Sequence, residues 1–426
     1  MAYLLNLVYL LLLLLGLPWF VWASFRKGKY REGWAAKFLG RVPIRTGNER
    51  CLWLHAVSVG EVNLLGPLLA RLEQQRPDWV YVISTTTKTG FDLAKKKYAP
   101  RTVFYCPLDF SWAVRQAMKR VRPNLLVLAE LELWPNLIQA AKKSGARVAV
   151  VNGRLSDRSF RRYGLIRPFV ARLLQSLDAV AAQNAEYAGR FRDLGAPADR
   201  VHLTGSIKFD GAQTDRDNPK TQQLARLAGI QAGDVVFLAG STQEPEEALA
   251  LQVYGELAAE YPALRLIVTP RHPERFEEVA TLLDRARIRW QRRSRLEEDG
   301  PDPQARVLLI DAIGELGAWW GTARIAFVGG SMGTRGGQNM IEPAAYGAAV
   351  SFGPNTSNFR DVVALLRERD AAAVVADRQQ LAAFVRRCLA EPRYAGELGQ
   401  RARQLVLEQA GAAGRTCDLL QLLMTD

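Results

Sequence analysis

The chain contains few of the residues that build metal sites and disulfide frameworks. Its 426 residues include four cysteines and three histidines. The cysteines show no CxxC spacing and the histidines are scattered, so the sequence indicates neither a zinc site nor a disulfide framework. This cysteine usage instead fits a catalytic portion in a reducing, cytoplasmic environment.

The chain also lacks a low-complexity tract long enough to indicate disorder. Hydrophobic residues make up 48% and charged residues 23%, an ordinary globular composition. The length predicts two to three domains of about 100–200 residues each. The net charge of +14 suits nucleic acid, an anionic membrane or phosphorylated substrates. The basic residues are dispersed and no recognition motif appears, so we expect no nucleic-acid partner.

The first 25 residues contain no Asp, Glu, Lys, Arg or His. A helix needs about 20 apolar residues to cross a bilayer, so residues 1–25 predict one transmembrane anchor. A cleaved signal peptide is the alternative, but the basic start is missing and bulky aromatic residues follow Pro18 in place of a small-residue cleavage site. The positive charges at 26–31 predict that the following domain lies in the cytoplasm.

Short apolar runs alternate with helical stretches from residue 51 onward, as in CLWLHAV, VYVIST, NLLVLAE and RVAVVN. This rhythm predicts parallel strands with helices on both faces of the sheet. A polar stretch at 208–219 interrupts the rhythm before it resumes with VVFLAGS and LRLIVTP. We therefore expect two doubly wound domains, at 30–207 and 220–426, joined by a linker, with the last helices able to pack back on the first domain.

Acidic residues follow two strands of the predicted first domain, where ligands bind in open α/β sheets. Glu61 begins a helix, so it could be a general base or the end of a capping box with Ser58. Glu130 and Glu132 follow the run LLVLA and could bind a ligand or cap the helix that begins at Pro135. The pattern alone leaves both alternatives open for each residue.

A glycine-rich segment at 329–339 follows a strand in the predicted second domain and offers backbone N–H groups to an anionic ligand. It lacks the GK[ST] ending of a Walker A loop and the GxGxxG spacing of a dinucleotide site. Glu342 could accept ribose hydroxyls or only stabilise a helix start. Arg271 and Lys208 could supply cations beside a phosphate or a sugar carboxylate. Residues 154–172 form a basic amphipathic stretch that suits an anionic lipid surface or a solvated helix face.

Several motifs in order along residues 30–360 resemble those of the bacterial Kdo (3-deoxy-D-manno-octulosonic acid) transferases. They are HAVSVGEV, STTTKTG, YCPLDF, ELELWPN, NGRLSDRSF, GSIKFD, PRHPERF, GELG and GGQNMIEPAAYG. The resemblance implies a GT-B glycosyltransferase fold with two Rossmann-like domains, an acceptor-binding one and a nucleotide-sugar-binding one. It also implies CMP-Kdo as donor, a lipid A precursor (lipid IVA) as acceptor, inversion at the anomeric carbon and no metal. The setting would be lipopolysaccharide inner-core biosynthesis at the inner membrane, in contact with its lipid.

The resemblance also assigns roles to residues. Glu61 matches the general base that deprotonates the acceptor glucosamine hydroxyl, while Glu130 and Glu132 match positions that orient donor or acceptor. The residues that would hold the donor or its departing phosphate are Lys208, Ser241, Thr242, Pro270, Arg271, Ile313, Gly314, Glu315, Asn339, Met340, Ile341 and Glu342.

Two departures from the family pattern stand out. Met340 and Ile341 replace Pro and Leu of an Asn-Pro-Leu-Glu run, and Ser206 replaces an Asn. Other readings remain open: a UDP-sugar transferase or epimerase on the same fold, or a membrane-tethered scaffold that tolerates loss of Glu61. The number of Kdo residues transferred, the acyl pattern of the acceptor and the oligomeric state do not follow from the sequence.

Overall fold

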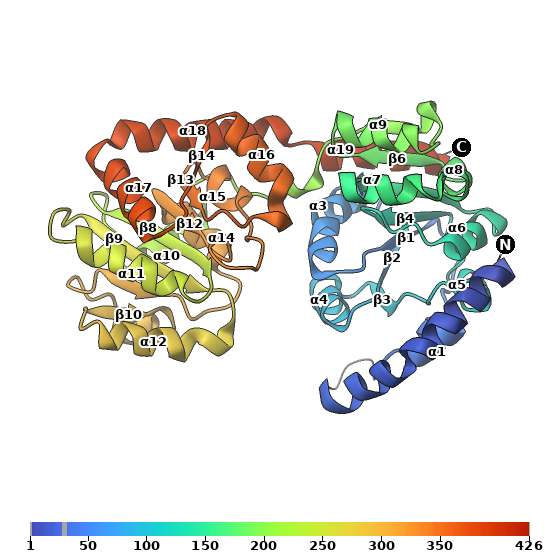
Figure 1. Cartoon of the computed structure of the whole chain (residues 1–426), viewed down its shortest axis with the longest axis horizontal. Helices are drawn as coiled ribbons and strands as arrows, with labels where there is room; N and C mark the ends of the chain where they lie inside the picture. The colour runs from blue at the N-terminus through green and yellow to red at the C-terminus, as the bar shows by residue number, and fades with distance from the viewer. Residues whose placement is uncertain (1, 28–31, 426) are drawn as a thin grey trace. The chain divides into compact units, whose positions relative to one another are not determined.

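A computed structural model describes the backbone of residues 2–27 and 32–425 and the side chains of residues 3–16 and 32–425. The chain divides into two compact units, one of residues 1–211 with 410–426 and the other of residues 212–409 (Figure 1). Each contains one seven-stranded sheet in which every pairing is parallel. The expectation of two parallel α/β domains is therefore confirmed.

The sheet of unit 1 has the strand order β3-β2-β1-β4-β5-β6-β7. Its strands are β1 (Cys51–His55), β2 (Val80–Thr85), β3 (Thr102–Tyr105), β4 (Leu125–Ala129), β5 (Arg147–Gly153), β6 (Ala179–Ala182) and β7 (Val201–Leu203). Its helices are α1 (Ala2–Lys27), α2 (Trp34–Leu39), α3 (Val59–Gln75), α4 (Lys88–Tyr98), α5 (Ser111–Val121), α6 (Pro135–Lys143), α7 (Asp157–Gly164), α8 (Arg167–Gln175), α9 (Ala185–Asp193) and α19 (Ala412–Thr425).

The sheet of unit 2 has the strand order β10-β11-β9-β8-β12-β13-β14. Its strands are β8 (Val235–Thr242), β9 (Leu264–Pro270), β10 (Trp290–Arg292), β11 (Val307–Leu309), β12 (Ile325–Val328), β13 (Ala349–Phe352) and β14 (Ala372–Val374). Its helices are α10 (Pro219–Leu227), α11 (Glu246–Leu257), α12 (Phe276–Arg285), α13 (Leu296–Asp299), α14 (Leu316–Trp319), α15 (Ile341–Ala345), α16 (Arg360–Glu368), α17 (Arg378–Ala390) and α18 (Pro392–Gln409).

Alternate residues of the central strand β4 enter two separate cores. Leu126 and Leu128 pack on one face of the sheet, whereas Leu125 and Val127 pack on the other, and all four are fully buried. Successive side chains of a strand point to opposite faces, so a continuous apolar run is stable only when helices cover both faces. This explains why the strands of the chain read as unbroken apolar runs.

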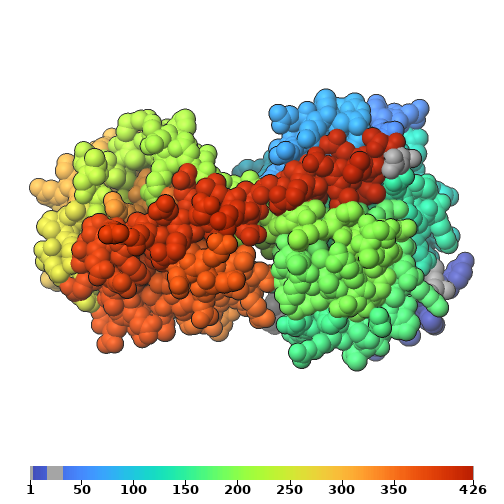
Figure 2. Space-filling view, turned by 90° about the horizontal axis from the view of Figure 1, so that it is seen from above, coloured from blue at the N-terminus to red at the C-terminus, as the bar shows by residue number. Residues whose placement is uncertain are grey.

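The last helix belongs to unit 1 although most of the preceding 200 residues form unit 2. Cys417, Leu420 and Met424 of α19 join the core on the α3 side of the first sheet. Figure 2 shows this red C-terminal segment lying on the surface of unit 1. The carboxylate of Asp210 accepts hydrogen bonds from the backbone N–H groups of Gly411 and Ala413, so the segment that leaves unit 1 and the segment that returns to it are tied together there.

Helix α1 packs against unit 1 through polar side chains. Asn6 donates to the hydroxyl of Ser111 at 2.7 Å, and Tyr9 donates to the carboxylate of Asp109 at 3.0 Å. In the portion of the chain whose side chains are described, no helix is long and apolar enough to cross a bilayer. The transmembrane span expected for residues 1–25 stays a prediction, because the side chains of residues 1, 2 and 17–25 lie outside the described residues.

Candidate functional site

Glu61 lies at the junction of β1 and α3, with its carboxylate turned back toward the chain that precedes the helix. Its two carboxylate oxygens accept hydrogen bonds from the N–H of Val57 and the hydroxyl of Ser58, each at 2.8 Å, and its own N–H donates to the Ser58 hydroxyl at 3.4 Å. The capping box is therefore present. Burial raises the pKa of Glu61 above its ordinary value, and the charge of Glu130 adds to this, although the hydrogen bonds to Val57 and Ser58 oppose it. A carboxylate that binds a proton more readily than usual is suited to general-base catalysis.

Glu130 and Glu132 follow β4, which is paired with β1, so the three carboxylates meet at the carboxyl edge of two neighbouring strands. Glu130 has a φ of 55°, a left-handed conformation that a residue with a side chain adopts at a cost. Burial raises the pKa of Glu132 to about 7, and the charges of Glu61 and Glu130 contribute, against the opposing hydrogen bond from the Trp134 indole at 2.8 Å. The site can therefore change its charge near neutral pH.

Lys208 supplies the positive charge of this acidic site. Its ammonium lies 3.3 Å from the carboxylate of Glu130, and both side chains are largely shielded from solvent. The structure places Lys208 in unit 1 beside Glu130, and its expected role beside the donor phosphate stays a prediction. Its ammonium neutralises the charge of the Glu130 carboxylate.

Asp109 caps the helix that follows Glu132, a function that the sequence left open for Glu130 and Glu132. Its carboxylate accepts hydrogen bonds from the N–H groups of Asn136 at 3.0 Å and Leu137 at 2.8 Å. The N-cap residue Trp134 provides no side-chain cap. Capping by Glu130 or Glu132 is therefore wrong, and the partners of these two carboxylates are instead Lys208 and the Trp134 indole. Burial raises the pKa of Asp109 to about 6.

Three neighbouring strands of unit 2 end at the residues predicted to hold the donor. Ser241 and Thr242 end β8, Pro270 ends β9, and the glycine-rich segment follows β12, in a sheet where β9, β8 and β12 are adjacent. Ser241 has a φ of 54°, and the N–H of Arg271 donates to the carbonyl of Thr242 at 3.0 Å. Thr242 is fully buried, and its hydroxyl donates to the carbonyl of Thr269 at 3.4 Å.

Glu342 is a partly buried acid of this second site. Burial raises its pKa, while a hydrogen bond from the Asn339 amide at 3.0 Å, the charge of Arg271 and a hydrogen bond from Trp320 oppose the rise. Asn339 and Arg271 therefore both act on the Glu342 carboxylate, one through a hydrogen bond and the other through its charge. Met340 and Ile341, which stand between Asn339 and Glu342 in the chain, are buried.

The loop Ile313–Glu315 divides into an exposed part and a fixed part. Ile313 is 80% exposed, and Gly314 has a φ of 87°. Glu315 instead forms a two-pronged ion pair with Arg293, with both nitrogen–oxygen distances at 2.8 Å. The Glu315 carboxylate is therefore already paired with Arg293 within unit 2, whereas the turn at Ile313 is open to a ligand.

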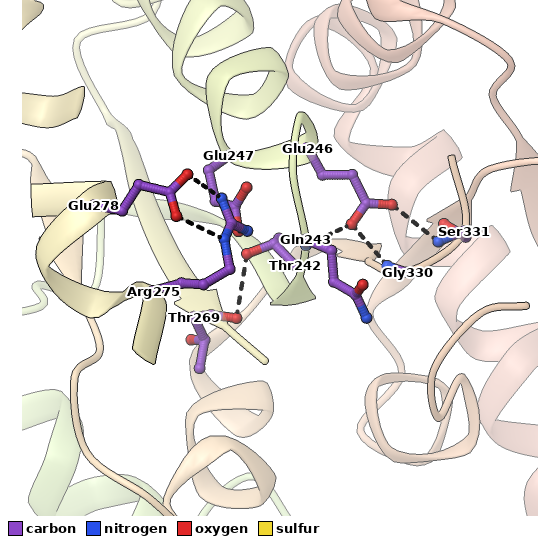
Figure 3. Close-up of polar contacts among 9 residues, drawn as sticks. All are labelled: Thr242, Gln243, Glu246, Glu247, Thr269, Arg275, Glu278, Gly330 and Ser331. Atoms are coloured by element: carbon purple, nitrogen blue, oxygen red, sulfur yellow. Dashed lines mark hydrogen bonds and ion pairs between the residues drawn. The ribbon is translucent and has the colours of Figure 1, made fainter. Parts of the chain in front are cut away.

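The start of the glycine-rich segment already binds an anion from its own chain. The carboxylate of Glu246 accepts hydrogen bonds from the N–H groups of Gly330 and Ser331 (Figure 3) and from that of Met332. The expectation that these amides are free for a ligand is therefore wrong for the first part of the segment. Sequence reasoning did not select Glu246, because these three partners lie more than 80 residues further along the chain.

Among residues 3–16 and 32–425 there is no group of three or more His, Cys, Asp or Glu side chains placed to hold a metal ion. Glu61, Glu130 and Glu132 pair instead with a lysine and hydrogen-bond donors. The metal-free mechanism stays a prediction.

Comparison with known proteins identifies the family. The family described as "3-Deoxy-D-manno-octulosonic-acid transferase (kdotransferase)" matches residues 32–211. The 3-deoxy-D-manno-octulosonic acid transferase of Haemophilus influenzae is 34% identical over 382 residues, which cover 88% of each chain. The enzyme of the same name from Bordetella pertussis is 35% identical, covering 87% of this chain and 86% of that one.

Solved structures with low sequence identity share the fold. A glycosyltransferase from Rickettsia africae superposes with a TM-score of 0.58 at 11% identity, covering 89% of this chain and 100% of that one. A UDP-GlcNAc 2-epimerase from Neisseria meningitidis does so with a TM-score of 0.57 at 15% identity, covering 84% and 99%. At these identities the likeness shows the two-domain α/β fold alone. The sequence relatives carry the assignment further: the chain is a glycosyltransferase and belongs to the family of 3-deoxy-D-manno-octulosonic acid transferases.

Proposed function

We propose that the chain transfers Kdo from CMP-Kdo to a glucosamine hydroxyl of a lipid A precursor, lipid IVA, in lipopolysaccharide inner-core biosynthesis. The names of the relatives support Kdo as the transferred sugar. The observation that carries the mechanism is the partly buried Glu61 carboxylate with its raised pKa, at the carboxyl end of β1. Donor binding falls to unit 2, where Arg271, Asn339 and Glu342 are coupled.

The reaction is a single displacement that inverts the anomeric carbon. The acceptor hydroxyl oxygen attacks that carbon while its proton passes to the Glu61 carboxylate. The bond from the anomeric carbon to the phosphate oxygen breaks, and CMP leaves with the electron pair. Arg271 stabilises the charge that develops on the departing phosphate, which is an electrostatic role that needs no metal. Glu130 and Glu132 orient the hydroxyl-rich substrates through hydrogen bonds.

We also propose that the enzyme works at the cytoplasmic face of the inner membrane, with α1 as its anchor. Large apolar side chains of α1, among them Leu4, Leu11 and Leu15, are exposed. Next to the acidic site, burial and the charge of Glu132 raise the pKa of Tyr163 in α7. The following turn exposes Leu165 and Ile166. Exposed apolar residues among arginines bind anionic lipid surfaces, which fits an acceptor held in a bilayer.

Donor identity is the test of this function. Purified full-length protein is given CMP-Kdo, UDP-N-acetylglucosamine or UDP-glucose together with lipid IVA, and products are resolved by mass spectrometry. Transfer of Kdo alone supports the proposal. Transfer from a UDP-sugar, or epimerisation of one, would refute it. Membrane attachment is tested separately, because deletion of residues 1–25 should release the protein from inner-membrane vesicles, and retention without them would contradict the anchor.

A further inference from the structure

The carboxylate of Glu246 is the most completely bonded acid near the donor residues of unit 2. One oxygen accepts the N–H groups of Gln243 at 2.9 Å and Gly330 at 2.7 Å. The other accepts those of Ser331 and Met332, both at 2.9 Å. The residue is 1% exposed. Four backbone donors therefore point at one buried charge, as they would at a bound anion.

The backbone at this point is shaped around the carboxylate. A Cβ atom added to Gly329 would lie 2.7 Å from a Glu246 oxygen and 2.6 Å from the carbonyl oxygen of Ser241. Only glycine allows so close an approach. Figure 3 shows Glu246 reaching from the start of α11 to Gly330 and Ser331, on the opposite side of Gln243 from the pair formed by Glu247 and Arg275.

Further hydrogen bonds connect the surroundings of Glu246 to the residues predicted to hold the donor. The carbonyl of Gly330 accepts the N–H of Gly337 at 2.7 Å, which brings the two ends of the glycine-rich segment together. Two residues later the Asn339 side chain donates to Glu342. The Gln243 amide at the other side of Glu246 follows Ser241 and Thr242 directly. One carboxylate therefore connects the loop after β8 to the loop after β12.

We propose that Glu246 is a positioning residue for the donor: it fills the amide nest at Gly330–Met332 and thereby holds Asn339 and Glu342 where the nucleotide binds. The inference rests on the donor role proposed for unit 2. Glu246 itself is buried and touches neither donor nor acceptor. A glutamine in its place has a single acceptor oxygen and turns an NH₂ group toward N–H donors, so it cannot satisfy all four amides.

The test compares Glu246→Gln with Asp234→Asn. Asp234 is a matched control because it is a shielded carboxylate in the same unit, paired with Arg265 at 2.8 Å and Arg306 at 2.7 Å, at the opposite end of β8. Both variants lose charged hydrogen bonds of similar kind. The measurements are kcat, KM for CMP-Kdo and KM for lipid IVA, together with the affinity for CMP and hydrogen exchange of the loop amides.

We expect Glu246→Gln to raise KM for CMP-Kdo by about tenfold or more and to weaken CMP binding in parallel, while KM for lipid IVA changes by less than about twofold. Exchange at 330–332 should accelerate in this variant and not in Asp234→Asn. An unchanged donor KM, or an equal rise in Asp234→Asn, would overturn the inference. If Glu246→Gln does not fold, Glu246→Asp keeps the charge but shortens its reach, and the same criteria apply. A wild type that binds no CMP-Kdo would refute the proposed donor instead.

Discussion

Removal of the Glu132 carboxyl should make unit 1 more stable, but only at neutral and alkaline pH. The pKa of this carboxyl is raised from 4.5 to about 7 by burial and by the charge of Glu61. Because the native state holds the proton more tightly than the unfolded chain, native stability falls as pH rises from about 4.5 to about 7. Glu132→Gln carries no charge to bury, so it should escape this loss.

The size of the effect follows from the gap between the two pKa values. At about 1.4 kcal/mol per unit of pKa, the gap between 4.5 and about 7 corresponds to about 3 kcal/mol. Since Glu132 is only half-buried, solvent screening reduces this to about 1–2 kcal/mol. The difference in the free energy of unfolding between Glu132→Gln and the wild type should therefore be about 1–2 kcal/mol larger at pH 8 than at pH 4.5.

Urea unfolding followed by pulsed hydrogen exchange measures the difference, because peptides from β1 and β4 report on unit 1 separately from unit 2. Glu49→Gln is the control, since it removes a carboxyl of the same unit whose side chain is 54% exposed. Its stability difference from the wild type should be nearly independent of pH. Parallel pH profiles for the wild type and Glu132→Gln would refute the electrostatic account of the site.

Three further results follow from the same geometry. Glu130→Gln should move the acidic limb of the kcat/KM profile to lower pH, because the charge of Glu130 raises the pKa of Glu61 and of Glu132. Lys208→Met should move the same limb to higher pH, because Glu130 would lose its counter-charge. Limbs that do not move in opposite directions in the two variants would contradict this. Arg271→Ala should raise KM for CMP-Kdo by about tenfold with KM for lipid IVA unchanged, and an equal rise in both would argue against a donor role. Initial rates should be the same with and without EDTA, and a loss that added Mg²⁺ restores would show a metal requirement.

The sequence predicted the fold well because the determining pattern is local. Continuous apolar runs such as LLVLA at 125–129 need cover on both faces, and the structure provides it with two cores. The Ser58–Glu61 capping box was also readable, since both partners lie within one helical turn. Family motifs then supplied the assignment that periodicity could not.

The site was less predictable where its contacts are long-range. Lys208 reaches Glu130 across 78 positions of the chain (208 − 130), and Asp109 caps a helix that begins 26 residues later (135 − 109). Glu246 fills the amide nest of a loop that looks unoccupied in the sequence. Sequence spacing identifies donors and acceptors, but only the sheet order shows which of them meet.

The most direct test of the central claim is the rate of Kdo transfer from CMP-Kdo to lipid IVA by the wild type and by Glu61→Gln. Glutamine keeps the shape of the side chain but cannot take the proton of the acceptor hydroxyl. The account predicts that kcat falls by about 100-fold or more while KM for CMP-Kdo and the affinity for CMP change little. A Glu61→Gln enzyme that retains wild-type kcat would contradict the role of Glu61 as the general base.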